Sequence, residues 1–194
     1  SIGCGRGCTL DRAVSNFESF KNHVSVLFWS LGNESYAGDI RVEMNSNYKG
    51  KDPDRLVHYE GVAENRPYED LISDMESQMY ASPEKIKEYL ENNPKKPFIL
   101  CEYMHDMGNS LGGMESYIRL LDQYEDYQGG FIWDYIDQAL FVKDEVTGRD
   151  VLRYGGDFDD RPSDYEFSGN GILFADRTEK PAMQEVRHYY GLRR

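Results

Sequence analysis

The run of apolar residues from Val24 to Leu31 is the feature that most restricts the fold of this chain. It is nearly unbroken and rich in β-branched and aromatic residues, which is typical of a parallel strand buried on both faces. A helical apolar stripe over Leu10–Asn22 precedes it, and Gly32 opens a loop at its carboxyl end. Because parallel strands are joined by crossovers, usually helices, we expect strands and helices to alternate along the chain.

The remaining sequence repeats this pattern of strand and helix. Further strands are expected over 56–59, 98–101 and 131–135, with a weaker one over 70–74 that ends near Met79-Tyr80, and helices over 83–92 and 114–124. The tail over 144–194 has no clear period and is expected to consist mainly of loops. Such alternation indicates parallel βαβ units, either in an open doubly wound sheet or in a piece of a barrel. No Gly-rich phosphate-binding motif follows the first strand.

Length and charge narrow the class of protein. The chain has 194 residues, enough for one domain but short of the ~250 of a complete (β/α)8 barrel. Its formal net charge of -13 would repel phosphate backbones and anionic membrane surfaces, so we expect neither nucleic acid nor membrane as a partner. No apolar run approaches the ~20 residues of a membrane span, and no signal peptide is recognisable at the start.

The cysteines are few and odd in number: Cys4, Cys8 and Cys101. This pattern does not predict the disulfide framework of a secreted domain, so we expect a reducing, cytoplasmic location. Cys4 and Cys8 lack a second pair of ligands nearby, which favours a frayed terminus over a zinc site.

Two glutamates follow apolar strand runs: Glu34 after 24–31 and Glu102 after 98–101. Functional groups of a parallel barrel lie where strands end, and a retaining glycosidase needs two carboxyl groups ~5 Å apart across the sugar. A single glutamate after a strand is more often a solvated loop residue, and a lone Trp or His is more often part of a core. The polar and aromatic residues at the expected strand ends nevertheless favour a glycosidase site: Asn33, Glu34, Tyr80, Glu102, His105 and Trp133.

Four segments carry a resemblance to a known family. They are FWSLGNES over 28–35, CEYMHDMGNS over 101–110, GGFIWD over 129–134 and NGILFADR over 170–177. In this order they resemble the bacterial β-galactosidases of glycoside hydrolase family 2. The similarity runs from about Asp11 to Tyr190, and the segment around Glu102 is specific to the galactosidases of that family.

The resemblance implies roles for the residues at the strand ends. Glu34 would be the general acid/base at the end of barrel strand four, and Glu102 the nucleophile at the end of strand seven. Tyr80 would hydrogen-bond the nucleophile, and Asn33 would contact the 2-hydroxyl of the sugar.

The resemblance also implies the remaining ligands of sugar and metal ions. His105 would contact the galactose 6-hydroxyl, and Trp133 would form the platform under the sugar. The Phe167 carbonyl and Asn170 match sodium ligands, and Glu34 matches one magnesium ligand. Both ions prefer hard oxygen ligands.

Two departures from the family limit this transfer. Val24 replaces a proline before strand four, which we interpret as a local loop change. The first three barrel strands, the other magnesium ligands, one sodium ligand and further sugar-binding histidines precede the matched region in the family. The resemblance therefore implies an α/β fold, a partial TIM (β/α)8 barrel of about strands four to eight over 11–194, without the N-terminal strands. Residues 1–10 are expected to be disordered or unrelated to the family.

The implied function is that of a retaining hydrolase of carbohydrate metabolism, which cleaves terminal non-reducing β-D-galactose from lactose-type galactosides through a covalent galactosyl-enzyme. The parent enzyme is expected to be a homo-oligomer. Two alternatives stay open. The chain could be an inert barrel fragment that acts only with a complementary half, since an open sheet edge exposes unpaired backbone groups. A related β-glucuronidase or β-mannosidase specificity is the other, although the region around His105 argues against it.

Overall fold

The computed structural model describes residues 2–192, with side-chain detail over 5–192. The chain divides into two compact units. The first unit comprises Ser1–Cys101 and Asp126–Gln128, and the second comprises Glu102–Glu125 and Gly129–Arg194.

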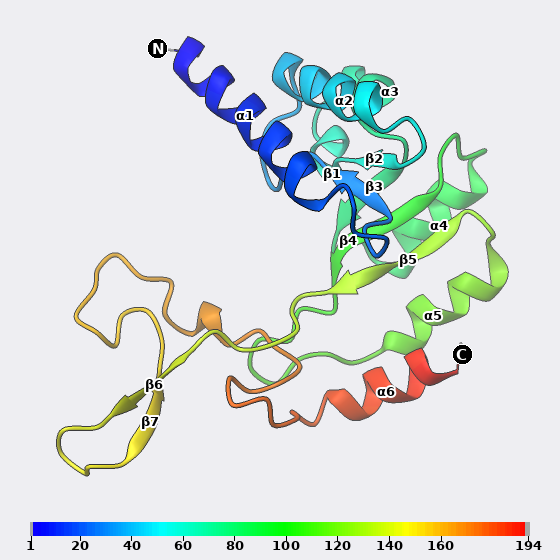
Figure 1. Ribbon diagram of the computed structural model, residues 1–194. Helices are drawn as coiled ribbons and strands as arrows, with labels where there is room; N and C mark the ends of the chain where they lie inside the picture. The colour runs from blue at the N-terminus through cyan, green and yellow to red at the C-terminus, as the bar shows by residue number, and fades with distance from the viewer. Residues whose placement is uncertain (1, 193–194) are drawn as a thin grey trace. The chain divides into compact units, whose positions relative to one another are not determined.

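The first unit begins with two helices and a pair of short strands (Figure 1): α1 Ile2–Phe20, β1 Phe28–Ser30, α2 Asp39–Lys51 and β2 Leu56–His58. β1 and β2 are parallel, with Ser30 opposite His58. The aromatic rings of Phe17, Trp29 and Tyr48 join α1, β1 and α2, with Trp29 stacked on Tyr48 at 5.2 Å between ring centroids. This aromatic cluster lies in the buried core of the first unit.

The start of α1 differs from the frayed terminus expected over 1–10. The helix already includes Ile2, while Ser1 lies outside the described residues. Arg6 forms an ion pair with Glu43 of α2, and the apolar stripe of the helix reaches back to Leu10, which packs against the core. These tertiary contacts stabilise the N-terminal turns of α1. They join residues far apart in the sequence, so the apolar pattern from Leu10 onward does not indicate them.

The rest of the first unit contains short helical turns and a second sheet: η1 Glu60–Ala63, η2 Arg66–Tyr68, α3 Glu69–Ile72, β3 Glu76–Met79 and α4 Pro83–Glu91. The sheet has the order β3-β4-β5, where β4 is Phe98–Tyr103 and β5 is Tyr127–Ile132, and both β4 and β5 end on residues assigned to the second unit. The helix expected over 83–92 is confirmed, with the Ser82 hydroxyl accepting from the Lys85 backbone N–H and Pro83 at the first helical position.

The weak strand expected from 70–74 ends at Met79 as predicted, but its start over 70–74 is wrong. Residues 69–72 form α3, and the strand begins at Glu76. Glu69 and Asp70 stand in the first turn of α3, where the helix dipole favours negative charge. Ile72 is fully buried in the core, so a single helical turn is enough to bury this side chain.

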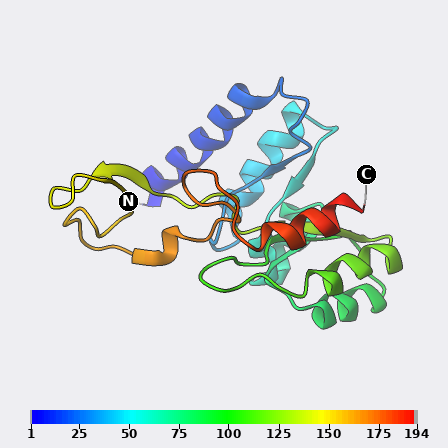
Figure 2. The same ribbon diagram turned by 90° about the horizontal axis from the view of Figure 1, so that it is seen from below.

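The second unit packs two helices around its own core: α5 Met114–Gln123 and α6 Met183–Gly191. Figure 2 shows α6, in red, beside α5, in green. A Glu185 carboxylate oxygen accepts the backbone N–H of Met114 at 2.8 Å, which caps the start of α5 from the neighbouring helix. The core of this unit contains Met114, Ile118, Ile172, Leu173 and Val186.

The tail over 144–194 has more regular structure than expected. β6 Leu140–Lys143 and β7 Asp150–Arg153 form an antiparallel hairpin, followed by η3 Tyr165–Ser168 and then α6. The strand expected over 131–135 lies earlier, since β5 ends at Ile132. The hairpin has no buried face, because the side chains of Leu140, Phe141 and Leu152 are exposed. Its sequence therefore lacks the apolar pattern by which buried strands are predicted.

The α/β class is confirmed by these elements. Over residues 2–192 the strands form three separate sheets, β1-β2, β3-β4-β5 and β6-β7, and no closed barrel. No helix within this range is both long and apolar enough to cross a membrane.

His58 joins three strands of the first unit. Its side chain is buried at 5% exposure, with Nδ1 3.0 Å from the Ser30 hydroxyl of β1 and Nε2 2.7 Å from the Ser77 hydroxyl of β3. Burial lowers the pKa of His58 to about 4. The ring is therefore neutral near pH 7, with one nitrogen donating and the other accepting.

This burial predicts a pH-dependent stability. An unfolded histidine binds a proton below pH 6.5, whereas the folded one does so only near pH 4, so stability falls as the pH falls between these values. The free energy of unfolding should drop by at most about 3 kcal/mol over this range. Urea unfolding at a series of pH values measures it. His58→Gln should flatten this dependence and His23→Gln should not. Equal slopes in the wild type and His58→Gln would contradict the assignment.

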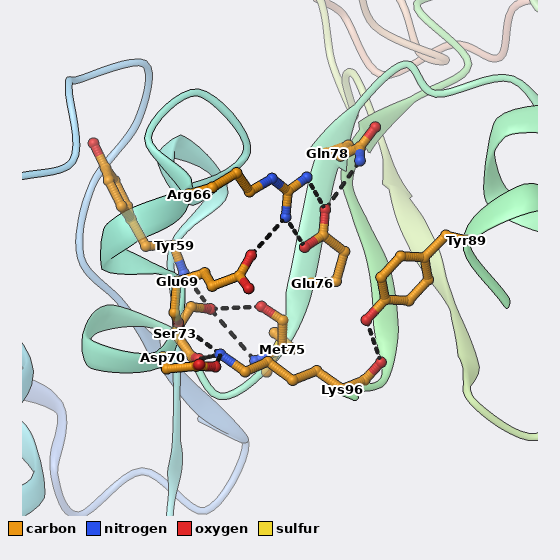
Figure 3. A network of polar contacts seen from close by, with 10 residues as sticks. All are labelled: Tyr59, Arg66, Glu69, Asp70, Ser73, Met75, Glu76, Gln78, Tyr89 and Lys96. Carbon is orange, nitrogen blue, oxygen red and sulfur yellow. Dashed lines mark hydrogen bonds and ion pairs between the residues drawn. The ribbon is translucent and has the colours of Figure 1, made fainter. Parts of the chain in front are cut away.

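A network of ion pairs ties η2 and α3 to β3 (Figure 3). The Arg66 guanidinium donates to both carboxylate oxygens of Glu76, at 2.6 and 2.9 Å, and to Glu69 at 3.1 Å. Glu76 is only 4% exposed and also accepts from Gln78 at 3.0 Å. The Lys96 ammonium donates to the backbone carbonyl of Glu69 at 2.6 Å. The network lines a cavity of about 520 Å³, and its charges are paired with each other.

Removing the arginine from this network should destabilise the first unit. Arg66→Met leaves the buried Glu76 carboxylate without its cation, at an expected cost of about 3 kcal/mol, the lower end for a broken buried pair because the Arg66 side chain is itself half-exposed. Lys87→Met is the matched control, because the Lys87–Glu91 pair on α4 is exposed and contributes less than about 1 kcal/mol. Thermal and urea unfolding of both variants test the difference, and similar losses would show that the Glu76 charge is not held by Arg66.

Candidate active site

The first group of predicted residues follows β1. The backbone turns at Gly32, with φ of 141°, and again at Glu34, with φ of 49°. The Arg41 guanidinium donates to the Leu31 carbonyl at 2.7 Å, and it lies 3.3 Å from where a side chain at position 32 would begin. Only glycine fits that close approach and that φ. The side chains of Asn33 and Glu34 are exposed beyond this turn.

The loop that carries Glu34 is held by residues that follow β2. The Glu34 backbone N–H donates to the Glu60 carboxylate at 2.5 Å, and the Tyr59 hydroxyl donates to the Ser35 carbonyl. Gly61 allows this approach, since a Cβ there would stand 2.7 Å from the Ser35 oxygen. The backbone of Glu34 is thus fixed while its carboxyl group faces outward.

Glu34 lines a cavity of about 250 Å³ together with Glu60, Glu64, Gln78 and Met79. Gln78 and Met79 are the last residues of β3, directly before Tyr80. Tyr80 also has a left-handed backbone, with φ of 51°. The structure therefore brings Glu34 and the segment before Tyr80 to one cavity of the first unit, as expected for residues at neighbouring strand ends.

The second group follows β4 and β5. Glu102 is half-buried and is the last residue but one of β4. The Trp133 backbone N–H donates to the Tyr103 carbonyl at 3.0 Å, and the Asp106 N–H donates to the Trp133 carbonyl at 2.9 Å. These hydrogen bonds join the segment that carries His105 to the segment that carries Trp133.

Trp133, Phe167 and Asn170 line a cavity of about 380 Å³ in the second unit. The His105 ring lies 5.6 Å from the Phe167 ring, so His105 contacts the same group of residues. Asn170 donates its side-chain N–H to the Phe167 carbonyl. Within the described part of the chain, Trp133 Nε1 and Asn170 Oδ1 are buried without a hydrogen-bond partner. A polar ligand would satisfy such atoms.

A buried acidic group lies beside these residues. Asp106 is 2% exposed, and burial raises the pKa of its carboxyl to about 6. The nearby charge of Lys180 lowers this pKa, and the charge of Asp137 raises it. Lys180 is itself paired with Asp137 at 2.8 Å. Burial also raises the pKa of Asp134. A carboxyl group that titrates near neutral pH is typical of functional sites, although ion-pair networks produce it too.

Sequence reasoning missed two carboxylates of these groups, Glu60 and Asp106. Glu60 follows the strand expected over 56–59 directly, so the rule that selected Glu34 would also have selected it. Asp106 lies inside the segment over 101–110, but nothing in the sequence indicated its burial.

The predicted site residues fall in both units. Asn33, Glu34 and Tyr80 belong to the first, and the second contains Glu102, His105, Trp133, Phe167 and Asn170. Over the residues with described side chains, no cluster of three or more His, Cys, Asp or Glu could hold a metal ion.

The sequence matches the family model described as "Glycosyl hydrolases family 2, TIM barrel domain" over residues 6–193. It is 73% identical over 183 residues to a β-galactosidase large subunit of Latilactobacillus sakei, covering 94% of this chain and 29% of that protein. It is 67% identical to the corresponding large subunit of Lactobacillus helveticus, covering 99% of this chain and 31% of that protein. A β-galactosidase of Halalkalibacterium halodurans is 60% identical, with 93% and 18% covered.

Solved structures with a similar fold include two bacterial β-glucuronidases. A Ruminococcus gnavus β-glucuronidase has a TM-score of 0.65 at 17% identity, over 97% of this chain and 35% of that one. An FMN-binding β-glucuronidase of Faecalibacterium prausnitzii L2-6 has a TM-score of 0.65 at 15% identity, over 95% and 32%. At these identities the likeness shows the fold alone. The chain spans about three tenths of the length of its large-subunit relatives, and the family match begins inside the segment expected to be unrelated. The chain therefore belongs to the glycosyl hydrolases of family 2, within their TIM barrel domain.

Proposed function

We propose that the protein containing this chain is a β-galactosidase that releases terminal non-reducing β-D-galactose from lactose-type galactosides. The observation that carries the proposal is the placement of Glu34 and Glu102 at the carboxyl ends of β1 and β4, on backbone that neighbouring segments hold by hydrogen bonds. The names of relatives at 60–73% identity support galactose as the sugar. Because the chain spans only part of those relatives, the activity is assigned to the complete protein.

The proposed mechanism retains the anomeric configuration. Glu34 donates its proton to the glycosidic oxygen while a Glu102 oxygen forms a bond to the anomeric carbon, and the aglycone leaves. Glu34 then takes a proton from water, whose oxygen attacks the same carbon and releases Glu102. Exposure of Glu34 at its cavity suits both steps, because it must meet a leaving group first and a water molecule later.

The other predicted residues would bind the sugar or support the nucleophile. Asn33 would hold the 2-hydroxyl, where hydrogen bonds strengthen in the transition state, and Tyr80 would donate to Glu102. In the second unit, Trp133 would form the sugar platform and His105 would contact the 6-hydroxyl. The orphaned Trp133 Nε1 supports a polar ligand at this cavity.

The two metal ions differ in how well the described residues fit them. The Phe167 carbonyl and the orphaned Asn170 Oδ1 provide two oxygen ligands of the kind that Na⁺ takes, and a bound Na⁺ would offer a positive charge to a sugar hydroxyl. For Mg²⁺ only Glu34 is assigned as a ligand, and residues 5–192 contain no acidic or histidine cluster suited to a metal. These residues alone do not fit a Mg²⁺ site.

The fold and assembly of the complete protein form part of the proposal. We assign this chain to about barrel strands four to eight, which agrees with the family and with the parallel β1-β2 pair. Several relatives are named large subunits, so we propose a multi-subunit enzyme, with the homo-oligomer as a further prediction. A cytoplasmic location is proposed as well, supported by the small, odd number of cysteines in the sequence.

A mechanism-based trap tests the proposal in the complete protein. A 2-deoxy-2-fluoro-β-galactosyl donor should form an adduct on Glu102, since the fluorine slows its hydrolysis more than its formation. Intact-mass spectrometry and peptide mapping detect it. Glu102→Gln should form no adduct and lose more than ~1,000-fold in kcat, because its amide is a poor nucleophile. Glu64→Gln is the control. An adduct at another residue would overturn the nucleophile assignment, and labelling by the glucuronyl analogue alone would favour the glucuronidase alternative.

Removal of the amide oxygen tests the sodium site. Asn170→Ala should raise the sodium concentration needed for half-maximal activity by ~10-fold or more, since one ligand is lost. Initial rates in a sodium titration, with choline keeping the ionic strength constant, measure it. Ser163→Ala changes the same cavity without removing an assigned ligand. An unchanged sodium dependence in Asn170→Ala would refute the assignment.

A further inference from the structure

We propose that Glu60 is the positioning residue for the acid/base carboxyl of Glu34, a role that rests on the proposed function. Its carboxylate accepts the Glu34 backbone N–H at 2.5 Å and thereby fixes the direction in which the Glu34 side chain leaves the backbone. Its position directly after the strand expected over 56–59 does not by itself indicate this contact with Glu34.

The hydrogen bond between the Glu34 backbone and the Glu60 side chain follows from the pairing of β1 with β2. Ser30 of β1 pairs with His58 of β2, so the two chains leave the parallel ladder at the same level. Glu60 begins η1 two residues after His58, and it is only 7% exposed. Its carboxylate is therefore held at the start of a packed turn, where it meets a backbone donor of the loop after β1.

The residues beside Glu60 hold the next peptide of the same loop. The Tyr59 hydroxyl donates to the Ser35 carbonyl, and the Arg41 guanidinium lies 5.0 Å above the Tyr59 ring. Arg41 in turn donates to the Leu31 carbonyl. The loop after β1 is thus attached at both ends and at Glu34 itself, and Glu60 provides the attachment that is closest to the acid/base carboxyl.

Glu34 needs such an attachment because its backbone is left-handed, with φ of 49°. A residue other than glycine adopts this conformation only when its surroundings hold it there. A charge-assisted hydrogen bond to the backbone N–H is stronger than a neutral one and suits this purpose. If the bond is lost, the backbone can relax and displace the carboxyl group from the glycosidic oxygen.

Substrates with different leaving groups distinguish positioning from a general structural role. Phenyl β-galactoside needs protonation of its leaving oxygen, whereas 2,4-dinitrophenyl β-galactoside departs without an acid. In the complete protein, Glu60→Ala should lower kcat/KM for the phenyl substrate by ~10–100-fold and for the dinitrophenyl substrate by less than ~3-fold. Glu60→Gln retains an acceptor oxygen and should stay within ~5-fold of the wild type for both.

A double-mutant cycle tests whether Glu60 acts through Glu34. In the Glu34→Ala background, adding Glu60→Ala should change kcat/KM by less than ~2-fold, because the group that Glu60 positions is already absent. Burst titration with a 2-fluoro galactosyl donor counts active sites, so partly unfolded variants are corrected for. Glu88→Ala is the control, as Glu88 is an exposed glutamate on α4 that does not line the Glu34 cavity.

The outcomes separate this inference from the proposed function. Equal losses for both substrates in Glu60→Ala, or a loss that persists in the Glu34→Ala background, would overturn the positioning role and leave Glu34 as the acid. If Glu34→Ala itself showed no preference for the dinitrophenyl substrate, the acid role of Glu34 would fail, and the role of Glu60 with it.

Discussion

The parallel ladder between β1 and β2 determines which groups can reach Glu34. With Ser30 opposite His58, the loop after β1 and the turn η1 start at the same edge, and Glu60 meets the Glu34 N–H. The same register places the His58 ring beside the Ser30 hydroxyl. A shift of one residue would turn every side chain of a strand to the opposite face and would remove both contacts. The pairing of β1 with β2 therefore positions both the structural His58–Ser30 contact and the Glu60–Glu34 contact at the candidate site.

Three buried carboxylates, those of Glu76, Glu60 and Asp106, have different hydrogen-bond and ion-pair partners. Glu76 is paired with Arg66, so its charge is balanced inside the first unit. Glu60 accepts a backbone donor and is placed at a cavity. Asp106 has one carboxylate oxygen without a partner in the described part of the chain, and burial raises its pKa. Since removing a charge from water is costly, the ion pair of Glu76 and the hydrogen bond of Glu60 each offset part of a burial cost that the partnerless oxygen of Asp106 does not offset.

The sequence predicted some elements from local signals, but the strand expected over 24–31 is shortened to β1 Phe28–Ser30, with Val24 and Leu27 exposed. The helix over 83–92 has its own cap and proline, so its start is local information. The turn at Glu69–Ile72 was mistaken for a strand, because one buried isoleucine in a short segment fits either period. Likewise, Glu34 and Glu102 were placed at strand ends from the apolar runs before them. The hydrogen bond from Glu34 to Glu60 depends on the pairing of two strands, which no single segment reveals.

Left-handed backbone at residues other than glycine recurs where the predicted site residues stand. Glu34, Tyr80 and Met104 have φ values of 49°, 51° and 55°, and they follow β1, β3 and β4. Met104 lies between Glu102 and His105 in the sequence. A sharp turn directly after a strand projects the next side chains from the sheet edge, and it persists only where neighbouring segments hold it. Loops usually move more than strands, yet catalysis requires groups fixed to within a fraction of an ångström. Contacts such as that of Glu60 resolve this conflict, because they give a loop residue the precision of the strands that flank it.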